Sequence, residues 1–125
     1  MNRERFESLV ARAVEALPEE FHQRLENIDV VVEDYPTRTQ IGENQKGKDF
    51  ILLGLYEGIP LTERDNHYGM VVPDKITIFQ KNFELLYGAD DFLIQKEIGK
   101  VVRHEVAHHF GISDERLDEL EGREY

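Results

Sequence analysis

Two histidines and one glutamate near the C-terminal end have the spacing of a metal-dependent hydrolytic site. His104 and His108 are four residues apart, so on an α-helix their imidazoles lie one turn apart on one face and can bind the same cation. Glu105 is rotated by about 100° from His104 around the helix axis, which places its carboxylate beside the metal. There it can act as general base for a water that the metal activates. The pattern H-E-x-x-H therefore predicts zinc-dependent hydrolysis, and a polar cluster on a helix surface is the alternative.

One long helix is expected to carry these residues, from about Asp90 to Phe110. The segment contains no proline, and aspartates at its start suit the positive end of a helix dipole. On a helical wheel Glu105 falls within the apolar face, where a carboxylate is costly unless it is paired or has a function. A solvated basic face is expected at Lys96, Lys100 and Arg103.

A third histidine, His109, directly follows His108 but faces elsewhere. It points about 140° away from His104 on a regular helix, so the two cannot bind the same cation. For His109 we expect a core position with its ring nitrogens hydrogen-bonded.

The third metal ligand is expected just beyond the helix. Gly111 can adopt the left-handed conformation that ends a helix, which lets the following residues turn back and brings Asp114 towards the two histidines. Asp114 also suits the first turn of a final helix from Ser113 to about Glu121, and it could serve both roles. Other residues remain open as substitutes for it, namely Glu115, Glu119 and His67.

The chain resembles a known family over most of its length. The string H-E-x-x-H-x-x-G-x-x-D resembles the extended zinc motif of the metzincin metallopeptidases, with aspartate in place of the third histidine. More closely, the chain is similar to the short bacterial "minimal zincin" metallopeptidases. Three further strings carry this resemblance, at 53–58, 60–64 and 73–79. One departure from true metzincins is that the only internal methionine, Met70, precedes the motif, so no methionine turn follows it.

The resemblance implies a fold and a set of residue roles. The implied fold is α+β and zincin-like, with a small mixed β-sheet packed against a long zinc-binding helix and further flanking helices. The implied ligands of one Zn²⁺ per chain are His104, His108 and Asp114, and Glu105 is the implied catalytic base. The implied activity is hydrolysis of a peptide or protein substrate. The alternative is a catalytically inactive domain of the same fold that binds zinc, a protein partner, or both.

Two further predictions concern the substrate. Backbone groups of an edge strand above the zinc helix can pair with an extended peptide, and residues 68–72 are our candidates for this strand. An ordinary core strand with its loop is the alternative. Tyr68 and His67 are the candidates for a second donor to the tetrahedral oxyanion.

Composition limits the classes of protein to consider. With 125 residues, 40% of them hydrophobic, the chain suits a single domain spanning 1–125. Without cysteine, a zinc site must use histidine and carboxylate ligands. A net charge of −11 opposes binding to nucleic acid. Neither a signal peptide nor a membrane-spanning segment is evident, so we expect a cytoplasmic protein with no membrane partner.

Hydrophobic periodicity predicts the remaining elements. Apolar residues from Phe6 to Leu17 recur at helical spacing, and Pro18 starts a short second helix to about Leu25. Alternation and β-branched residues predict three strands, at 29–35, 50–56 and 75–79. A helical turn is expected at 82–87, and exposed polar loops are expected at 37–48 and 62–69.

Overall fold

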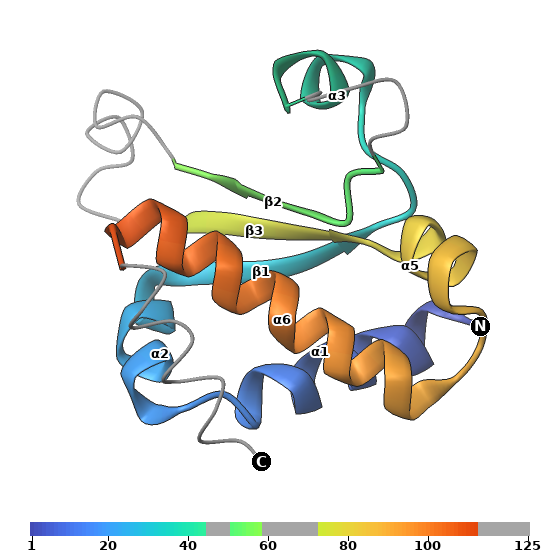
Figure 1. The fold of residues 1–125 in the computed structure, drawn as a ribbon, viewed down its shortest axis with the longest axis horizontal. Helices are drawn as coiled ribbons and strands as arrows, with labels where there is room; N and C mark the ends of the chain where they lie inside the picture. Colours follow the sequence, from blue (N-terminus) through green and yellow to red (C-terminus); the bar gives the residue numbers. More distant parts are fainter. Residues whose placement is uncertain (45–50, 59–72, 113–125) are drawn as a thin grey trace.

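In the part of the chain that the structure describes, three strands form one mixed sheet, and helices pack against one of its faces (Figure 1). The computed structural model describes residues 1–44, 51–58 and 73–112. In chain order the elements are α1 (Arg3–Glu15), α2 (Glu19–Arg24), the 3₁₀ turn η1 (Leu25–Asn27), β1 (Ile28–Glu33), α3 (Arg38–Asn44), β2 (Gly54–Glu57), β3 (Asp74–Phe79), α5 (Gln80–Tyr87) and α6 (Asp91–Phe110). The predicted α+β class, with a small mixed sheet against a long helix, is confirmed.

The central strand is β3, which pairs with β1 in parallel and with β2 in antiparallel orientation. Its side chains alternate between the two faces of the sheet. Ile76 and Ile78 are fully buried in the main core, which also contains residues of α1, α2, α5 and α6. Phe79 lies on the other face, in a small cluster with Leu52 and Leu55. The sheet thus separates a large core under the helices from a small one.

The longest helix, α6, runs along the sheet and packs against both β2 and α1 (Figure 1). The Asp90 side chain caps its start by accepting a hydrogen bond from the Leu93 amide at 3.1 Å. Gly111 ends it in the left-handed conformation, with φ of 68° and ψ of 29°. Just beyond, the Ile112 amide donates to the Ala107 carbonyl at 2.9 Å. The predicted bounds of this helix are confirmed, and no described helix is long and apolar enough to cross a membrane.

A helix occupies part of a segment that we predicted to be an exposed loop. The prediction of a loop at 37–48 was wrong at α3. It rested on the polar composition of the segment, but a local capping pattern starts a helix there. Thr37 and Gln40 form a capping box, in which the Gln40 amide donates to the Thr37 hydroxyl at 3.1 Å. In return, the Thr37 amide donates to the Gln40 side-chain carbonyl at 2.9 Å. This reciprocal pair starts a helix even though the segment has few apolar residues.

The strand predicted at 50–56 starts later than expected. In the antiparallel register Gly54 lies opposite Ile78, one residue before β3 ends at Phe79, so the residues before Leu53 run past the end of β3. After Phe79 the chain enters α5, so the next contacts to this segment come from helix side chains instead of a paired strand. Asn82 of α5 donates its side-chain amide to the Leu52 carbonyl at 2.8 Å. The Phe79 amide at the end of β3 donates to the Leu53 carbonyl at 2.9 Å, so the segment 51–53 is held both by the last residue of β3 and by α5.

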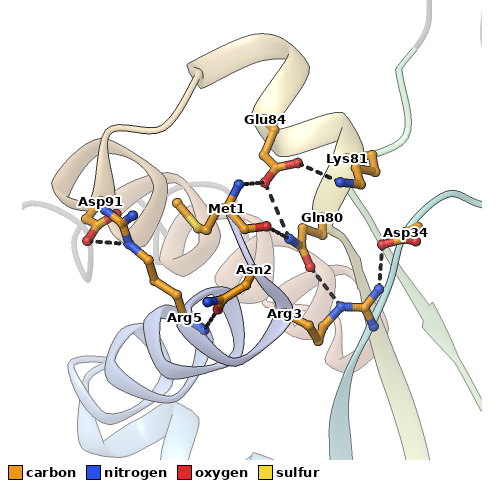
Figure 2. Close-up of polar contacts among 9 residues, drawn as sticks. All are labelled: Met1, Asn2, Arg3, Arg5, Asp34, Gln80, Lys81, Glu84 and Asp91. Carbon is orange, nitrogen blue, oxygen red and sulfur yellow. Dashed lines mark hydrogen bonds and ion pairs between the residues drawn. The ribbon is translucent and has the colours of Figure 1, made fainter.

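A polar network joins the start of α1 to β1, α5 and the start of α6 (Figure 2). The amino group of Met1 lies 3.1 Å from a carboxylate oxygen of Glu84. Gln80 donates to the Met1 carbonyl at 2.9 Å and accepts from Arg3 at 2.8 Å. Arg3 in turn pairs with Asp34 at 2.5 Å, after the end of β1. A third ion pair at the start of α1 is formed by Arg5 and Asp91.

Opposing effects act on the pKa of Glu84. Burial raises it, but hydrogen bonds from the Met1 amino group and Gln80, together with the positive charges of Lys81 and the amino group, lower it more. The pKa of Glu84 therefore lies below its ordinary value of 4.5. Because the folded state holds the charged form, Glu84 stabilises the fold above the ordinary pKa and ceases to do so as the pH falls through the lowered pKa.

Replacing Gly54 by alanine should destabilise the fold. A Cβ at this position would lie 2.5 Å from Cγ1 of Val101, so β2 and α6 would have to separate. We expect the free energy of unfolding to fall by about 1–3 kcal/mol in chemical denaturation. Gly42→Ala is the matched control, because a Cβ there meets nothing within 4 Å and alanine favours a helix by about 0.5–1 kcal/mol. Equal stability of the two variants would contradict the close approach.

Replacing Glu84 by glutamine should reduce the dependence of stability on pH in acid. Above the ordinary pKa of 4.5 the variant should be less stable than the parent chain, and the gap should close as the pH falls through the lowered pKa of Glu84. Thermal denaturation across this range measures the gap. Glu7→Gln, on the exposed side of α1, controls for the loss of one negative charge. A gap that stays constant with pH would show that the ion pair with Met1 does not stabilise the fold.

Candidate functional site

A groove of about 360 Å³ lies between α6 and the segment that leads into β2. One wall consists of Ile51, Leu52, Leu53 and Gly54. The other wall is a face of α6, where residues recur at helical spacing: Glu97, Lys100, Val101, His104 and Glu105. The groove thus combines an apolar wall with a helix face that carries two of the residues predicted from the H-E-x-x-H pattern.

The two histidines of the pattern lie where the helical spacing places them. His104 and His108 are exposed and occupy successive turns of α6. Their ring centroids are 6.3 Å apart and the ring planes are inclined by 66°. The rings are therefore neighbours on one exposed face of the helix.

Glu105 is half-buried, between the exposed histidines and the core side of α6. Its neighbours Val106 and Ala107 are fully buried, so the rotation of the helix about its axis is fixed by packing. As predicted, Glu105 falls on the side of the helix that faces other elements. It lines the groove together with His104, which brings a carboxylate and an imidazole to the same wall.

The prediction of a core position for His109 was wrong. Its side chain is 40% exposed, and its ring stacks on Tyr56 of β2 with centroids 3.9 Å apart and planes inclined by 15°. The Tyr56 hydroxyl donates to Asp74 of β3 at 2.6 Å, and His109 Nε2 lies 3.9 Å from the same carboxylate oxygen. His109 sits near the end of α6, beyond the core, where the sheet offers an aromatic ring and a carboxylate. Aromatic stacking at this point holds the end of α6 against the sheet.

Arg103 also differs from prediction, because it is 5% exposed and not part of a solvated basic face. It lines a second groove, between α1 and α6, together with Ala13, Leu17 and Gly99. The absence of a side chain at Gly99 leaves room for the guanidinium, which lies 3.6 Å from the position of a Cβ there. A helical wheel shows which residues of one helix share a face, so it could not predict that α1 covers this side of α6.

Several predicted site residues lie outside the described residues. These are Asp114, its possible substitutes Glu115, Glu119 and His67, and the candidate oxyanion donor Tyr68 together with the proposed groove strand at 68–72. Within the described residues no group of three potential ligands comes together. Of the predicted zinc ligands and base, the structure therefore describes His104, His108 and Glu105.

The comparisons with known proteins bear on the same residues. Residues 25–123, which include the groove and α6, match the family model of zincin-like metallopeptidases. The chain belongs to this family. No curated protein matches the sequence. The zincin-like assignment confirms the family resemblance drawn from the motif strings, and it accounts for the mixed sheet beside a long helix.

The residues of this zincin-like chain fit the zinc that the family implies. Two imidazoles on successive turns are ligands that zinc prefers, and the chain has no cysteine to compete with them. Both histidine side chains are exposed, so ligation does not require the core to open. Gly111 ends α6 less than one turn after His108, which allows the chain to change direction beside the pair.

One site residue that the sequence analysis missed is Tyr56. Its role depends on the alternation of β2, since Gly54 and Tyr56 lie on the same face of the strand and both meet α6. Small and aromatic residues two apart in a strand are compatible with a close helix crossing. That pattern is too common to have identified the contact without the pairing register.

The two adjacent histidines should differ in their effect on bound zinc. His108→Ala should abolish zinc binding, whereas His109→Ala should keep about one zinc per chain, because its ring lies against Tyr56. Plasma mass spectrometry of protein purified without a tag measures the metal. Thermal denaturation checks that both variants are folded. Loss of zinc from both variants would mean that His109 takes part in binding.

Proposed function

We propose that the chain is a zinc-dependent peptidase that cleaves a peptide bond held in the groove between α6 and the segment 51–54. The observation that carries this proposal is the groove itself, because His104 and Glu105 share one of its walls. A metal ligand and a base on a flat surface would have no neighbouring wall to position a substrate. Membership of the zincin-like metallopeptidase family supports the same activity.

We assign His104 and His108 as zinc ligands, with Asp114 as the third. Zinc in catalytic sites is usually held by three protein ligands and keeps one position open. When bound there, zinc would act as a Lewis acid that polarises the substrate carbonyl and lowers the pKa of water towards about 7. Asp114 follows the left-handed turn at Gly111 by three residues, which is the support for this assignment.

Glu105 is the residue proposed to move the proton. Its carboxylate accepts a proton from the water that attacks the carbonyl and later donates it to the leaving amine. Its half-buried position on the groove wall suits this role, since it places the carboxylate beside a peptide bound in the groove. The buried residues Val106 and Ala107 hold the helix in the rotation that directs Glu105 into the groove.

The substrate is proposed to be an extended peptide. The wall formed by Ile51, Leu52 and Leu53 is apolar, so it favours apolar side chains next to the cleaved bond. In the described part of the sheet β2 is an outer strand, and an outer strand can add an extended peptide through backbone hydrogen bonds. We retain residues 68–72 as a further proposed part of the groove, with Tyr68 and His67 as proposed oxyanion donors.

Metal content and peptide cleavage, measured on the same preparations, test the proposal. We expect zinc in the parent chain and in Glu105→Gln, with hydrolysis of a peptide library lowered by about 10²–10⁴-fold in the variant. Loss of zinc on His104→Ala checks that the metal occupies this site. Zinc with no cleavage by the parent chain would favour the alternative, a zinc-binding domain without catalysis. Cleavage that survives Glu105→Gln would exclude the proposed base.

A further inference from the structure

The groove continues along α6 beyond the proposed catalytic residues. Lys100 lies one helical turn before His104, and Glu97 lies almost one turn before Lys100, on the same wall. These two charged residues have no part in the proposed hydrolysis. They nevertheless face the space through which a bound peptide would extend away from the cleaved bond.

The Glu97 carboxylate already has two partners. It forms an ion pair with Lys100 at 3.6 Å, and it lies close enough to the Tyr87 hydroxyl at the end of α5 to raise the pKa of that phenol. Burial, followed by the negative charge of Glu97 and the contact of its carboxylate with the phenol, raises the pKa of Tyr87 more than the positive charge of Lys100 lowers it. With 18% of its side chain exposed, Glu97 has little capacity for a further cationic partner.

Lys100 is in the opposite situation. Its side chain is 39% exposed, about twice the exposed fraction of Glu97. The ion pair with Glu97 is the polar contact that the described residues provide, and an ammonium has three N–H donors. Lys100 is thus fixed in direction by Glu97 while it keeps donors for an acceptor within the groove.

We propose that Lys100 recognises a carboxylate of the bound peptide, which makes acidic peptides the preferred substrate class. The carboxylate can belong to an acidic side chain or to the C-terminus of the peptide. The inference rests on the proposed peptidase function, because the groove is taken as the substrate site. A neutral or cationic group at this position would leave the outer donors of Lys100 without an acidic partner.

Helix geometry places the recognised carboxylate a short distance from the cleaved bond. Lys100 precedes His104 by four residues, which is about 6 Å along the helix axis, and its side chain leans further towards the helix start. An extended peptide advances about 3.3 Å per residue. The carboxylate should therefore lie about two to four residues from the cleaved bond, with apolar residues between them against Ile51 and Leu53.

This preference is opposite to the one that the overall charge suggests. A net charge of −11 attracts cations over most of the surface. Within the groove, however, contact distances decide the outcome, because bulk salt screens remote charges over about 8–10 Å. Among the described residues that line the groove, Lys100 carries the ammonium group, so a local carboxylate site can exist within an acidic protein.

A matched peptide series tests the proposal. The peptides share one cleaved bond with apolar neighbours and carry Glu, Gln or Lys at the second to fourth position on either side. Each is made with a free C-terminal carboxylate and with an amide, which separates a terminal from a side-chain carboxylate. For the parent chain we expect kcat/KM to favour Glu over Gln by about three- to tenfold at low salt. The preference should shrink as salt is added.

Three variants separate Lys100 from general charge effects. Lys100→Gln should lower the preference to about one, and Lys100→Arg should retain it. Lys96→Gln removes an equal charge from an exposed position that lines the other groove, so it should leave the preference unchanged. A preference that persists in Lys100→Gln, or a parent chain that favours Lys peptides, would overturn the proposal.

Binding to the Glu105→Gln variant gives a readout that does not depend on turnover. The dissociation constants of the same peptides, measured by fluorescence polarisation, should show the same preference and lose it when Lys100→Gln is added. If the peptides bind with this preference but are not cleaved by the parent chain, the peptidase proposal fails and the carboxylate site stands. Cleavage without any acidic preference would leave the peptidase and remove the carboxylate site. Absence of peptide binding would overturn the inference.

Discussion

The close packing of β2 on α6 is the constraint on which the rest of the structure depends. At Gly54 the strand comes so near to Val101 that a single methyl group would prevent the contact. Two residues further along β2, Tyr56 stacks on His109 and fixes the end of the same helix. These two contacts set the distance and the rotation of α6 relative to the sheet. The groove wall and the direction of the H-E-x-x-H residues follow from them.

Helical spacing is enough to predict which residues of α6 share a face, but not what each face meets. The positions of His104, Glu105 and His108 follow from the period of the helix alone, so they could be read from the sequence. Arg103 and His109 could not, because α1 covers one and β2 the other. Both contacts join segments that are far apart in the chain, and no local pattern encodes them.

The strands and short helices illustrate the same division. The central strand β3 is β-branched and apolar at alternate positions, and its bounds agree closely with prediction. The length of β2 is set by where β3 gives way to α5, which is a property of the partner and not of β2 itself. The α3 helix was predictable in principle, since the capping box of Thr37 and Gln40 is local. The third ligand stays a prediction because its position depends on the chain beyond Ile112.

The parallel pairing of β1 with β3 has a consequence for how the chain acquires its structure. Ile28 must find Asp74, and Glu33 must find Phe79, before the sheet exists, so the pairing closes a long loop. Until β3 and α6 have been synthesised, the apolar residues Val30 and Val32 have neither their strand partner nor their core. Such exposure favours aggregation during folding. The large negative charge of the chain opposes it, because nascent copies repel one another.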